Sequence, residues 1–234
     1  MSEFEFKLAR LLEVWSIELK EHANQKLQDK FLNTYGLKDI PQQPRKVTKY
    51  NYYGCVNVRM LEELLKADLI NREDVILDVG CGTGIFLIYM AANGFKHLIG
   101  QDLDPDLLAI ARRNKKAFLK KSPEYQGNIE LRLENAVTTN FPDDVNVCYL
   151  FNSFYDQQTY EEWLMNVEQS LKRNPRHLTI VLLYPTPASM GAFRKNGAWL
   201  KETQIIESAT QVCSYCVRFQ VFENNVINTG SCRL

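Results

Sequence analysis

The sequence predicts an α/β fold in which helices wind around both faces of a mostly parallel sheet. Short apolar runs alternate with amphipathic segments of helical length between about residues 57 and 184, and this alternation is typical of parallel strands joined by right-handed crossovers. Residues 75–79 form a nearly unbroken apolar run, as in a strand that is buried on both faces. A glycine-rich stretch, residues 80–84, follows that run directly and opens a helical pattern.

The composition is that of an ordinary globular protein. The chain has 234 residues, of which 45% are hydrophobic, 11% aromatic and 24% charged. This excludes disorder, collagen and coiled coil as the dominant state, and the length fits one large domain. Lys and Arg together number 28, as do Asp and Glu, so the net charge is zero. Zero charge disfavours a dedicated nucleic-acid-binding protein, because such proteins bind largely by neutralising phosphates.

An amphipathic helix is expected over residues 3–35, ending at Gly36. Its apolar residues recur every three or four positions and are Phe4, Leu8, Leu11, Leu12, Trp15, Leu19, Ala23, Leu27 and Phe31. We expect this stripe to pack on the body of the domain; the alternative is that it pairs with a second copy to form a homodimer. Residues 1–50 are interpreted as a helical extension or lid, and residues 51–234 as the ligand-binding domain.

The elements of the main domain follow in order along the chain. Helices are expected at 57–68, 84–93, 105–121 and 157–173. Strands are expected at 75–79, from 98, at 129–133, 145–151 and 178–184. Asp104 and Pro105 start the third helix as N-cap and first-turn residue, and Asn93-Gly94 ends the second.

Two further strands complete a predicted sheet of seven. They lie near 199–206 and 214–222, and no convincing helix separates them. We therefore expect them to pair antiparallel at one edge of the sheet. The strand at 129–133 alternates apolar and polar residues, which predicts a position near an edge of the sheet, with one face more exposed to solvent.

The glycine-rich stretch after the first buried strand predicts a ligand site. It reads Asp78-Val79-Gly80-Cys81-Gly82-Thr83-Gly84. Glycines allow a sharp turn and let a ligand approach the backbone closely, and the following helix start offers free N–H groups and a positive dipole end. Ligands of open α/β sheets bind beyond the carboxyl ends of the strands.

The spacing of the glycines does not fit two well-known nucleotide-binding motifs, the dinucleotide fingerprint and the P-loop. The dinucleotide fingerprint needs a third glycine at position 85, where the chain has Ile85, and the P-loop needs a lysine that is absent here. The pattern D-x-G-x-G-x-G resembles motif I of the class I S-adenosylmethionine-dependent methyltransferases. This resemblance extends over about residues 50–184 and implies a Rossmann-like fold with S-adenosylmethionine as cofactor.

The resemblance implies a set of cofactor-binding residues. Asp78 corresponds to an acid near the cofactor's amino group, and Asp102 to a carboxylate that accepts both ribose hydroxyls, 22 residues after Gly80. Leu103 is placed against one face of the adenine. The full set is Tyr53, Asp78, Gly80, Cys81, Gly82, Gly84, Asp102, Leu103, Asn135, Ala136 and Asn152.

Three members of that set, Tyr53, Asn135 and Ala136, are matched by their likeness to particular segments of the family. Asn135 and Ala136 resemble the segment that contacts the adenine edge, although the family often has Asp at the position of Asn135. Asn can accept at its carbonyl but carries no charge. Tyr53 matches a tyrosine that closes over the cofactor in a group of small bacterial methyltransferases.

The acceptor side is predicted after the fourth strand. In the family this loop faces the transferred methyl, and here it contains the candidate catalytic residues Asn152, Tyr155 and Asp156. Either Tyr155 or Asp156 is a candidate base or orienting group. The amino-methyltransferases of nucleic acids carry Pro-Pro after the first of these positions, and this chain has neither proline.

The resulting functional hypothesis is methyl transfer from S-adenosylmethionine to an O or N acceptor. A small molecule or sugar is the favoured acceptor, because the net charge is zero and the Pro-Pro pair is missing. Three alternatives stay open: a protein or RNA N-methyltransferase, a non-catalytic module that binds the cofactor or a partner, and a dinucleotide-linked oxidoreductase.

The remaining features predict no metal site and no membrane association. Cys213, Cys216 and Cys232 lack the second pair of ligands that a zinc site needs. The first residues lack the basic and apolar regions of a signal peptide, and no apolar run approaches the roughly 18 residues of a membrane span. We expect a cytoplasmic protein with reduced cysteines.

Overall fold

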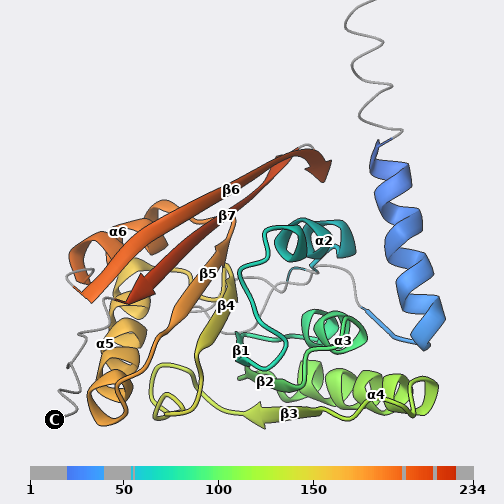
Figure 1. Cartoon of the computed structure of the whole chain (residues 1–234), viewed down its shortest axis with the longest axis horizontal. Coiled ribbons are helices and arrows are strands. Elements are labelled where there is room, and N and C mark those ends of the chain that lie inside the picture. The colour runs from blue at the N-terminus through green and yellow to red at the C-terminus, as the bar shows by residue number, and fades with distance from the viewer. Residues whose placement is uncertain (1–19, 40–53, 55, 197–198, 213–214, 225–234) are drawn as a thin grey trace, which may run out of the picture.

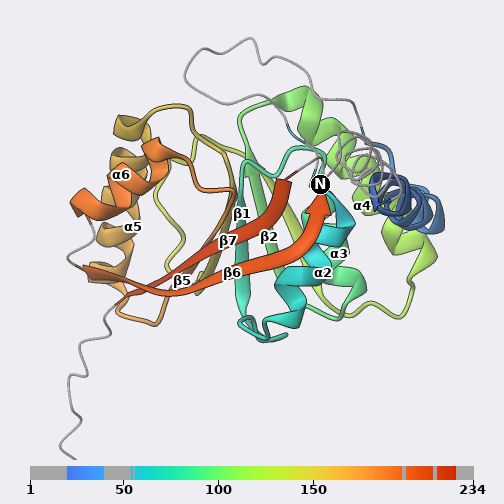
Figure 2. The same ribbon diagram turned by 90° about the horizontal axis from the view of Figure 1, so that it is seen from above.

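The computed structural model describes residues 20–39, 54, 56–196, 199–212 and 215–224. Seven strands form one sheet, and helices cover both of its faces (Figure 1, Figure 2). The strands are β1 (Val75–Val79), β2 (His97–Asp102), β3 (Asn128–Leu133), β4 (Val147–Phe151), β5 (Thr179–Leu183), β6 (Leu200–Val212) and β7 (Tyr215–Asn224). The helices are α2 (Val58–Lys66), α3 (Ile85–Ala92), α4 (Pro105–Lys121), α5 (Gln157–Arg173) and α6 (Pro187–Asn196), preceded by a helix at 20–35.

The strand order confirms the predicted doubly wound sheet with an antiparallel edge pair. The order is β3-β2-β1-β4-β5-β7-β6. Strands β1 to β5 run parallel, and β7 pairs antiparallel with both β5 and β6. The order reverses between β1 and β4, which makes the carboxyl ends of these two strands the place where a ligand is expected. Strand β3 lies at the opposite edge, as its alternating pattern predicts.

Two apolar cores fill the space between the sheet and its helices. One core joins the sheet to α2, α3 and α4, and the other joins it to α5 and α6. Figure 2 shows these two groups of helices on opposite faces of the sheet. Helix α3 is buried along nearly its whole length, from Ile85 to Ala91, so it is apolar all round rather than amphipathic. Among the described residues, no helix is long and apolar enough to cross a membrane.

The described part of the N-terminal helix packs on the body of the domain, as its stripe predicts. The ring of Phe31 lies 5.4 Å from that of Tyr89 in α3, and the ring of Tyr35 lies 5.2 Å from that of Phe118 in α4. Gly36 ends the helix with φ 66°, and the Leu37 amide donates to the Leu32 carbonyl. Such a left-handed turn is a common way to end a helix. Residues 3–19 of the predicted helix lie outside the described residues.

The start and end signals predicted for α3 and α4 are confirmed. The Asp104 side chain accepts hydrogen bonds from the amides of Asp106 and Leu107, and Pro105 is the first residue of α4. Gly94, with φ 90°, follows the last turn of α3. These ends depend on local chemistry only, which is why the sequence predicts them well.

Two features of the carboxyl-terminal third are not predicted. Strand β6 continues six residues past 206, to Val212, and its hairpin with β7 extends beyond α2 (Figure 1). Helix α6 is absent from the sequence-based prediction, because two prolines and a glycine interrupt its pattern. Thr186 and Ser189 hold its first turn, since each backbone amide donates to the other side chain's oxygen. Thr186-Pro187 is a helix start signal that could have revealed it.

Replacing Gly100 by alanine is expected to destabilise the fold. A Cβ atom at this position of β2 would lie 2.4 Å from the Leu87 Cδ1 atom and 2.9 Å from the Cys81 Sγ atom. Relieving that overlap requires shifts in a packed core, which typically lowers the free energy of unfolding by about 1–3 kcal/mol. Urea denaturation measures the loss. Gly54→Ala is the control, because a Cβ atom there meets the Phe151 ring at an ordinary 3.8 Å; equal stability of the two variants would contradict the prediction.

Candidate functional site

The glycine loop lies at the carboxyl end of β1, beside the reversal in strand order. Gly80, Gly82 and Gly84 have φ of 80°, 54° and 78°, which are left-handed values that side chains with a Cβ atom rarely adopt. The amides of Gly80 and Cys81 donate to the Gln101 carbonyl at 2.9 and 3.0 Å. The loop therefore curls back toward β2 before α3 begins, as the motif predicts.

Asp102 at the end of β2 fastens this loop in place. Its carboxylate is only 2% exposed. Oδ2 accepts a hydrogen bond from the Gly82 amide, and Oδ1 accepts one from the Asp104 amide, both at 2.9 Å. A carboxylate oxygen can accept two hydrogen bonds. Asp102 is thus held at a fixed place at the end of β2, beside the glycine loop.

Asp78 is a buried carboxyl group beside the glycine loop. It is 4% exposed, and no described residue donates a hydrogen bond to it. Burial, and then the neighbouring charge of Asp102, raise the pKa of Asp78 well above its ordinary value. A buried acid without a partner is costly. Its position beside the glycine loop makes it a site at which a positively charged ligand group would be stabilised.

The loop after β3 holds the residues predicted at the adenine edge. Asn135 Oδ1 accepts from the Val137 amide at 2.9 Å, and its carbonyl accepts from the amides of Thr138 and Thr139. Asn166 of α5 donates to the Ala136 carbonyl at 3.2 Å. The Asn135 side chain therefore begins a tight turn, and α5 supports that turn from behind. A role of its oxygen toward adenine stays a prediction.

The predicted acceptor side lies at the carboxyl ends of β4 and β5. Asn152 and Tyr184, the residues that follow these neighbouring strands, have φ of 47° and 49°. Two left-handed residues other than glycine at one edge of a sheet are unusual, and such strain gathers at functional sites. The rings of Phe151 and Tyr184 lie 6.1 Å apart. The sequence marked Asn152 but contained no signal for the backbone conformation of Tyr184.

Tyr53 lies outside the described residues. Its neighbour Gly54 is described, and a Cβ atom there would be 3.8 Å from the Phe151 ring. The chain next to Tyr53 therefore reaches the end of β4, where the acceptor side is predicted.

Tyr155 and Asp156 are placed differently from each other. Tyr155 is 65% exposed. The Asp156 carboxylate caps α5, because Oδ1 accepts from the Thr159 amide at 2.8 Å and from the Thr159 hydroxyl at 3.0 Å. This is the common structural role of an acid before a helix. A chemical role for Asp156 stays a prediction. In that role an acceptor proton would compete with the Thr159 amide and hydroxyl for the Oδ1 atom.

Ser153 is a site residue that sequence reasoning missed. Its hydroxyl donates to the Val79 carbonyl, and a Cβ atom on Gly80 would lie 3.4 Å from the Ser153 Cβ atom. Ser153 thereby joins the loop after β4 to the glycine loop. No sequence signal reveals this, because a serine in a polar loop has no distinctive pattern.

The cysteines show no metal site in the described ranges. Cys81 and Cys148 are free and buried, and burial raises the pKa of the Cys148 thiol. Within these ranges, no three His, Cys, Asp or Glu side chains gather around a common point. The side chains of Cys213, Cys216 and Cys232 lie outside the described part of the chain.

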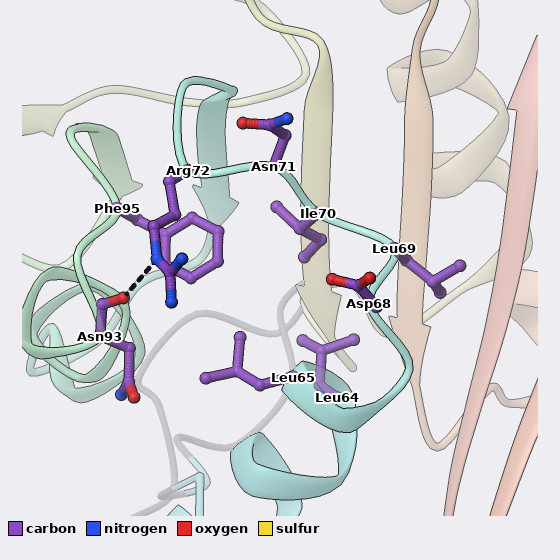
Figure 3. Close-up of a pocket in the computed structure, with 9 residues that line it drawn as sticks. All are labelled: Leu64, Leu65, Asp68, Leu69, Ile70, Asn71, Arg72, Asn93 and Phe95. Carbon is purple, nitrogen blue, oxygen red and sulfur yellow. Dashed lines mark hydrogen bonds between the residues drawn. The ribbon is translucent and has the colours of Figure 1, made fainter.

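A cavity lies at the end of the sheet opposite to the glycine loop. This cavity of about 270 Å³ lies between the end of α2 and the segments that lead into β1 and β2, and Figure 3 shows the side chains that line it. Leu65, Ile70 and Phe95 contribute apolar walls, and Arg72 donates to the Asn93 carbonyl at 3.1 Å. The cavity therefore lies at the amino ends of the parallel strands and is separate from the glycine loop.

Comparison with known proteins agrees with this geometry. Residues 76–174 match a family described as a methyltransferase domain. A tRNA U34 carboxymethyltransferase of Helicobacter pylori (strain HPAG1) is 24% identical over 69% of this chain and 62% of its own length. A ribosomal protein L11 methyltransferase of Lachnospira eligens is 34% identical over 30% of this chain and 20% of its own length. The chain thus spans less than two thirds of either curated relative.

Solved structures show the same fold. A magnesium protoporphyrin IX methyltransferase from Synechocystis PCC 6803, solved with bound S-adenosylmethionine, superposes with a TM-score of 0.52 at 12% identity, over 88% of this chain and 97% of its own. A Streptococcus pneumoniae protein described as a putative tRNA (m1A22) methyltransferase superposes with a TM-score of 0.52 at 17% identity, over 76% of this chain and 74% of its own. At such identities the likeness concerns the fold alone.

Proposed function

We propose, from the class I S-adenosylmethionine-dependent methyltransferase domain that this chain contains, that the protein transfers a methyl group to an O or N acceptor. S-adenosylmethionine is the cofactor of this class of domain. The observation that carries the proposal is the buried Asp78 carboxyl group, which receives no hydrogen bond from a described residue and lies beside a glycine loop with three left-handed residues.

The residues present fit this cofactor. The glycines leave room for a ligand to approach the backbone, and the start of α3 presents N–H groups there. Asp102 is held by two backbone amides at the end of β2, and its carboxylate is the group proposed to accept the ribose hydroxyls. Asp78 would lie near the cofactor's ammonium group, which offsets the cost of burying the carboxylate.

The remaining cofactor residues are assigned by position. Leu103 follows Asp102 directly and is half-buried, which suits contact with one face of the adenine. Asn135 and Ala136 follow β3, the strand next to β2. Tyr53, whose neighbour Gly54 lies near Phe151, is proposed to cover the cofactor, with residues 1–50 helping to close the site.

The chemistry proposed for the acceptor side is alignment and exclusion of water. When bound, S-adenosylmethionine supplies a methyl group on a positively charged sulfur. Asn152 can orient an acceptor N–H or O–H through its side-chain oxygen, and the rings of Phe151 and Tyr184 provide apolar walls. Tyr155 or Asp156 is proposed to take or orient the acceptor proton.

A small molecule or sugar is the acceptor class we propose. The zero net charge and the missing Pro-Pro pair after Asn152 support it. Protein or RNA N-methylation is the second candidate, because curated relatives of this chain are named for tRNA and for a ribosomal protein. Transfer of radiolabelled methyl to a cytosolic small-molecule extract, compared with total tRNA and ribosomal protein, separates the candidates. Label in tRNA or protein alone would refute the favoured class.

Binding of the demethylated cofactor is the first test of the proposal. Isothermal titration with S-adenosylhomocysteine is expected to show one site per chain, and titration with NAD is expected to show none. Absence of S-adenosylhomocysteine binding by the folded protein would overturn the assignment. Tyr155→Phe is expected to keep this binding while reducing methyl transfer, because Tyr155 is exposed and is proposed only for the acceptor proton; a fully active variant would remove Tyr155 from the proposed chemistry.

A further inference from the structure

A buried asparagine of α4 joins the N-terminal segment to the glycine loop. The Asn114 side chain is 1% exposed. Its Nδ2 group donates to the Thr83 carbonyl at 3.0 Å and to the Lys38 carbonyl at 2.7 Å, and its Oδ1 atom accepts from the Lys38 amide at 2.7 Å. Both hydrogens of the amide are thus used, one on each segment.

A second hydrogen bond connects the same two segments. The Thr83 hydroxyl donates to Asp39 Oδ1 at 3.1 Å, and Thr83 is 1% exposed. Thr83 is therefore held through its carbonyl by Asn114 and through its hydroxyl by Asp39. Residues 38 and 39 lie three and four residues beyond the helix at 20–35, so both bonds attach the end of that segment to the glycine loop.

Helix α4 presents one continuous face to this loop. A Cβ atom on Gly84 would lie 3.2 Å from the Ala111 Cβ atom. Asn114 is three residues further along, on the same side of the helix. Ala111 thus packs closely against Gly84, and Asn114 donates a hydrogen bond to the carbonyl of Thr83. These two contacts lie on either side of the peptide bond between Thr83 and Gly84.

We propose that Asn114 is a positioning residue for the cofactor, and that docking of the N-terminal helix and binding of the cofactor stabilise each other through it. This inference rests on the proposed function. A loop with three left-handed glycines has much conformational freedom to lose on binding. Bonds that hold the Thr83 peptide in place remove part of that freedom beforehand, so the cofactor meets a pre-formed loop.

The coupling is necessarily reciprocal. If the attached N-terminal segment tightens cofactor binding by some factor, then the cofactor stabilises docking of the segment by the same factor. Asn114 contributes to both, because its one side chain bonds to Lys38 and to Thr83.

Cofactor affinity provides the first test. Asn114→Ala is expected to weaken S-adenosylhomocysteine binding about tenfold in isothermal titration, since a lost buried hydrogen bond leaves its former partners less well satisfied. Thr83→Val removes only the hydroxyl and is expected to weaken binding in the same direction, whereas Thr83→Ser retains the hydroxyl and the affinity. Thermal unfolding verifies that each variant is folded, and Thr83→Val keeps the test valid where Asn114→Ala does not fold.

Asn146→Ala is the matched control. Asn146 also joins two segments, accepting from the Val75 amide and donating to Asp74, both at 2.7 Å, but at the amino ends of β1 and β4. It is expected to lose stability and to keep its affinity for S-adenosylhomocysteine. A general loss of stability would weaken binding in both variants, so equal weakening in Asn114→Ala and Asn146→Ala would overturn the proposal.

Hydrogen exchange of the N-terminal helix provides the second test. S-adenosylhomocysteine is expected to slow amide exchange at residues 20–35 in the wild-type protein, although the ligand site is at the glycine loop. The slowing is expected to be lost in Asn114→Ala. Unchanged exchange in the wild type on saturation would overturn the coupling. If the wild type fails to bind at all, the proposed function fails; if it binds and the variants bind equally well, only this inference fails.

Discussion

Replacing Asp78 by asparagine is expected to make the free protein more stable and at the same time to weaken cofactor binding by about a hundredfold or more. The carboxyl group is buried, and no described residue donates a hydrogen bond to it, so removing its charge removes a cost of folding. The same charge is the group proposed to meet the cofactor's ammonium group, and loss of a charged partner typically costs about 3 kcal/mol or more.

The pH dependence of the free energy of unfolding gives the sign of the effect of Asp78 on stability. Burial and Asp102 raise the pKa of Asp78 well above the value it has in the unfolded chain, so the folded protein binds more protons than the unfolded one between these two pKa values. The contribution of Asp78 to stability is therefore fully present below the unfolded pKa and is lost as pH rises through the raised pKa. In Asp78→Asn this part of the decline is expected to disappear.

Thermal unfolding and titration measure the two effects separately. Near neutral pH the free variant is expected to melt at least about 2–4 °C higher, which corresponds to about 1 kcal/mol in a domain of this size. Binding of the cofactor to the wild type is expected to tighten as pH rises toward the raised pKa, because the bound cation favours the ionised carboxylate, and the variant is expected to lose this dependence. Asp106→Asn, an exposed acid in the first turn of α4, is the control. A variant that binds as tightly as the wild type would contradict the role of Asp78.

Replacing Asp102 by asparagine is expected to weaken cofactor binding to a similar extent but to destabilise the protein. Both oxygens of this carboxylate accept backbone hydrogen bonds, from Gly82 and from Asp104. An amide side chain has one oxygen, so its nitrogen would face one of the two N–H groups and leave a buried donor unsatisfied. Each such group costs about 1–3 kcal/mol. The glycine loop also loses its attachment to β2.

Urea denaturation and titration with S-adenosylhomocysteine test this pair of effects. Asp104→Asn is the matched control, because asparagine caps a helix about as well as aspartate and Asp104 lies two residues away. It is expected to change neither quantity much. Asp78→Asn and Asp102→Asn thus alter stability in opposite directions and affinity in the same direction. Normal affinity in a folded Asp102→Asn would contradict both the ribose role and the loop attachment.

Most of the fold can be predicted because its signals are local. The apolar run of β1, the Asp104-Pro105 start of α4 and the Asn93-Gly94 end of α3 each depend on a few neighbouring residues. Helix α6 was missed although Thr186-Pro187 is such a signal, because nearby prolines and Gly191 obscured the helical pattern. The length of β6 was underestimated, because its continuation depends on pairing with β7 rather than on its own pattern.

The candidate site also has one part that can be predicted from the sequence and one part that cannot. The glycine loop, Asp78 and Asp102 are predictable, because their spacing along the chain is a recognisable motif. The hydrogen bonds that hold the glycine loop in place cannot be predicted from the sequence. Ser153 bonds to Val79 and Asn114 bonds to Thr83 across 74 and 31 residues of sequence, and nothing in a single serine or asparagine reveals its partner.

The sequence by itself therefore determined the class of fold, and it predicts the place of the ligand site and the residues that a cofactor would meet. Only the tertiary structure decided which of those residues are already occupied. Asp156 caps α5, Asn135 begins a turn and Asp102 fastens the glycine loop, whereas Asp78 is buried with no hydrogen-bond donor among the described residues. The physical reason is that a motif records which side chains are present, while their protonation, strain and remaining hydrogen-bonding capacity depend on neighbours that only folding brings together.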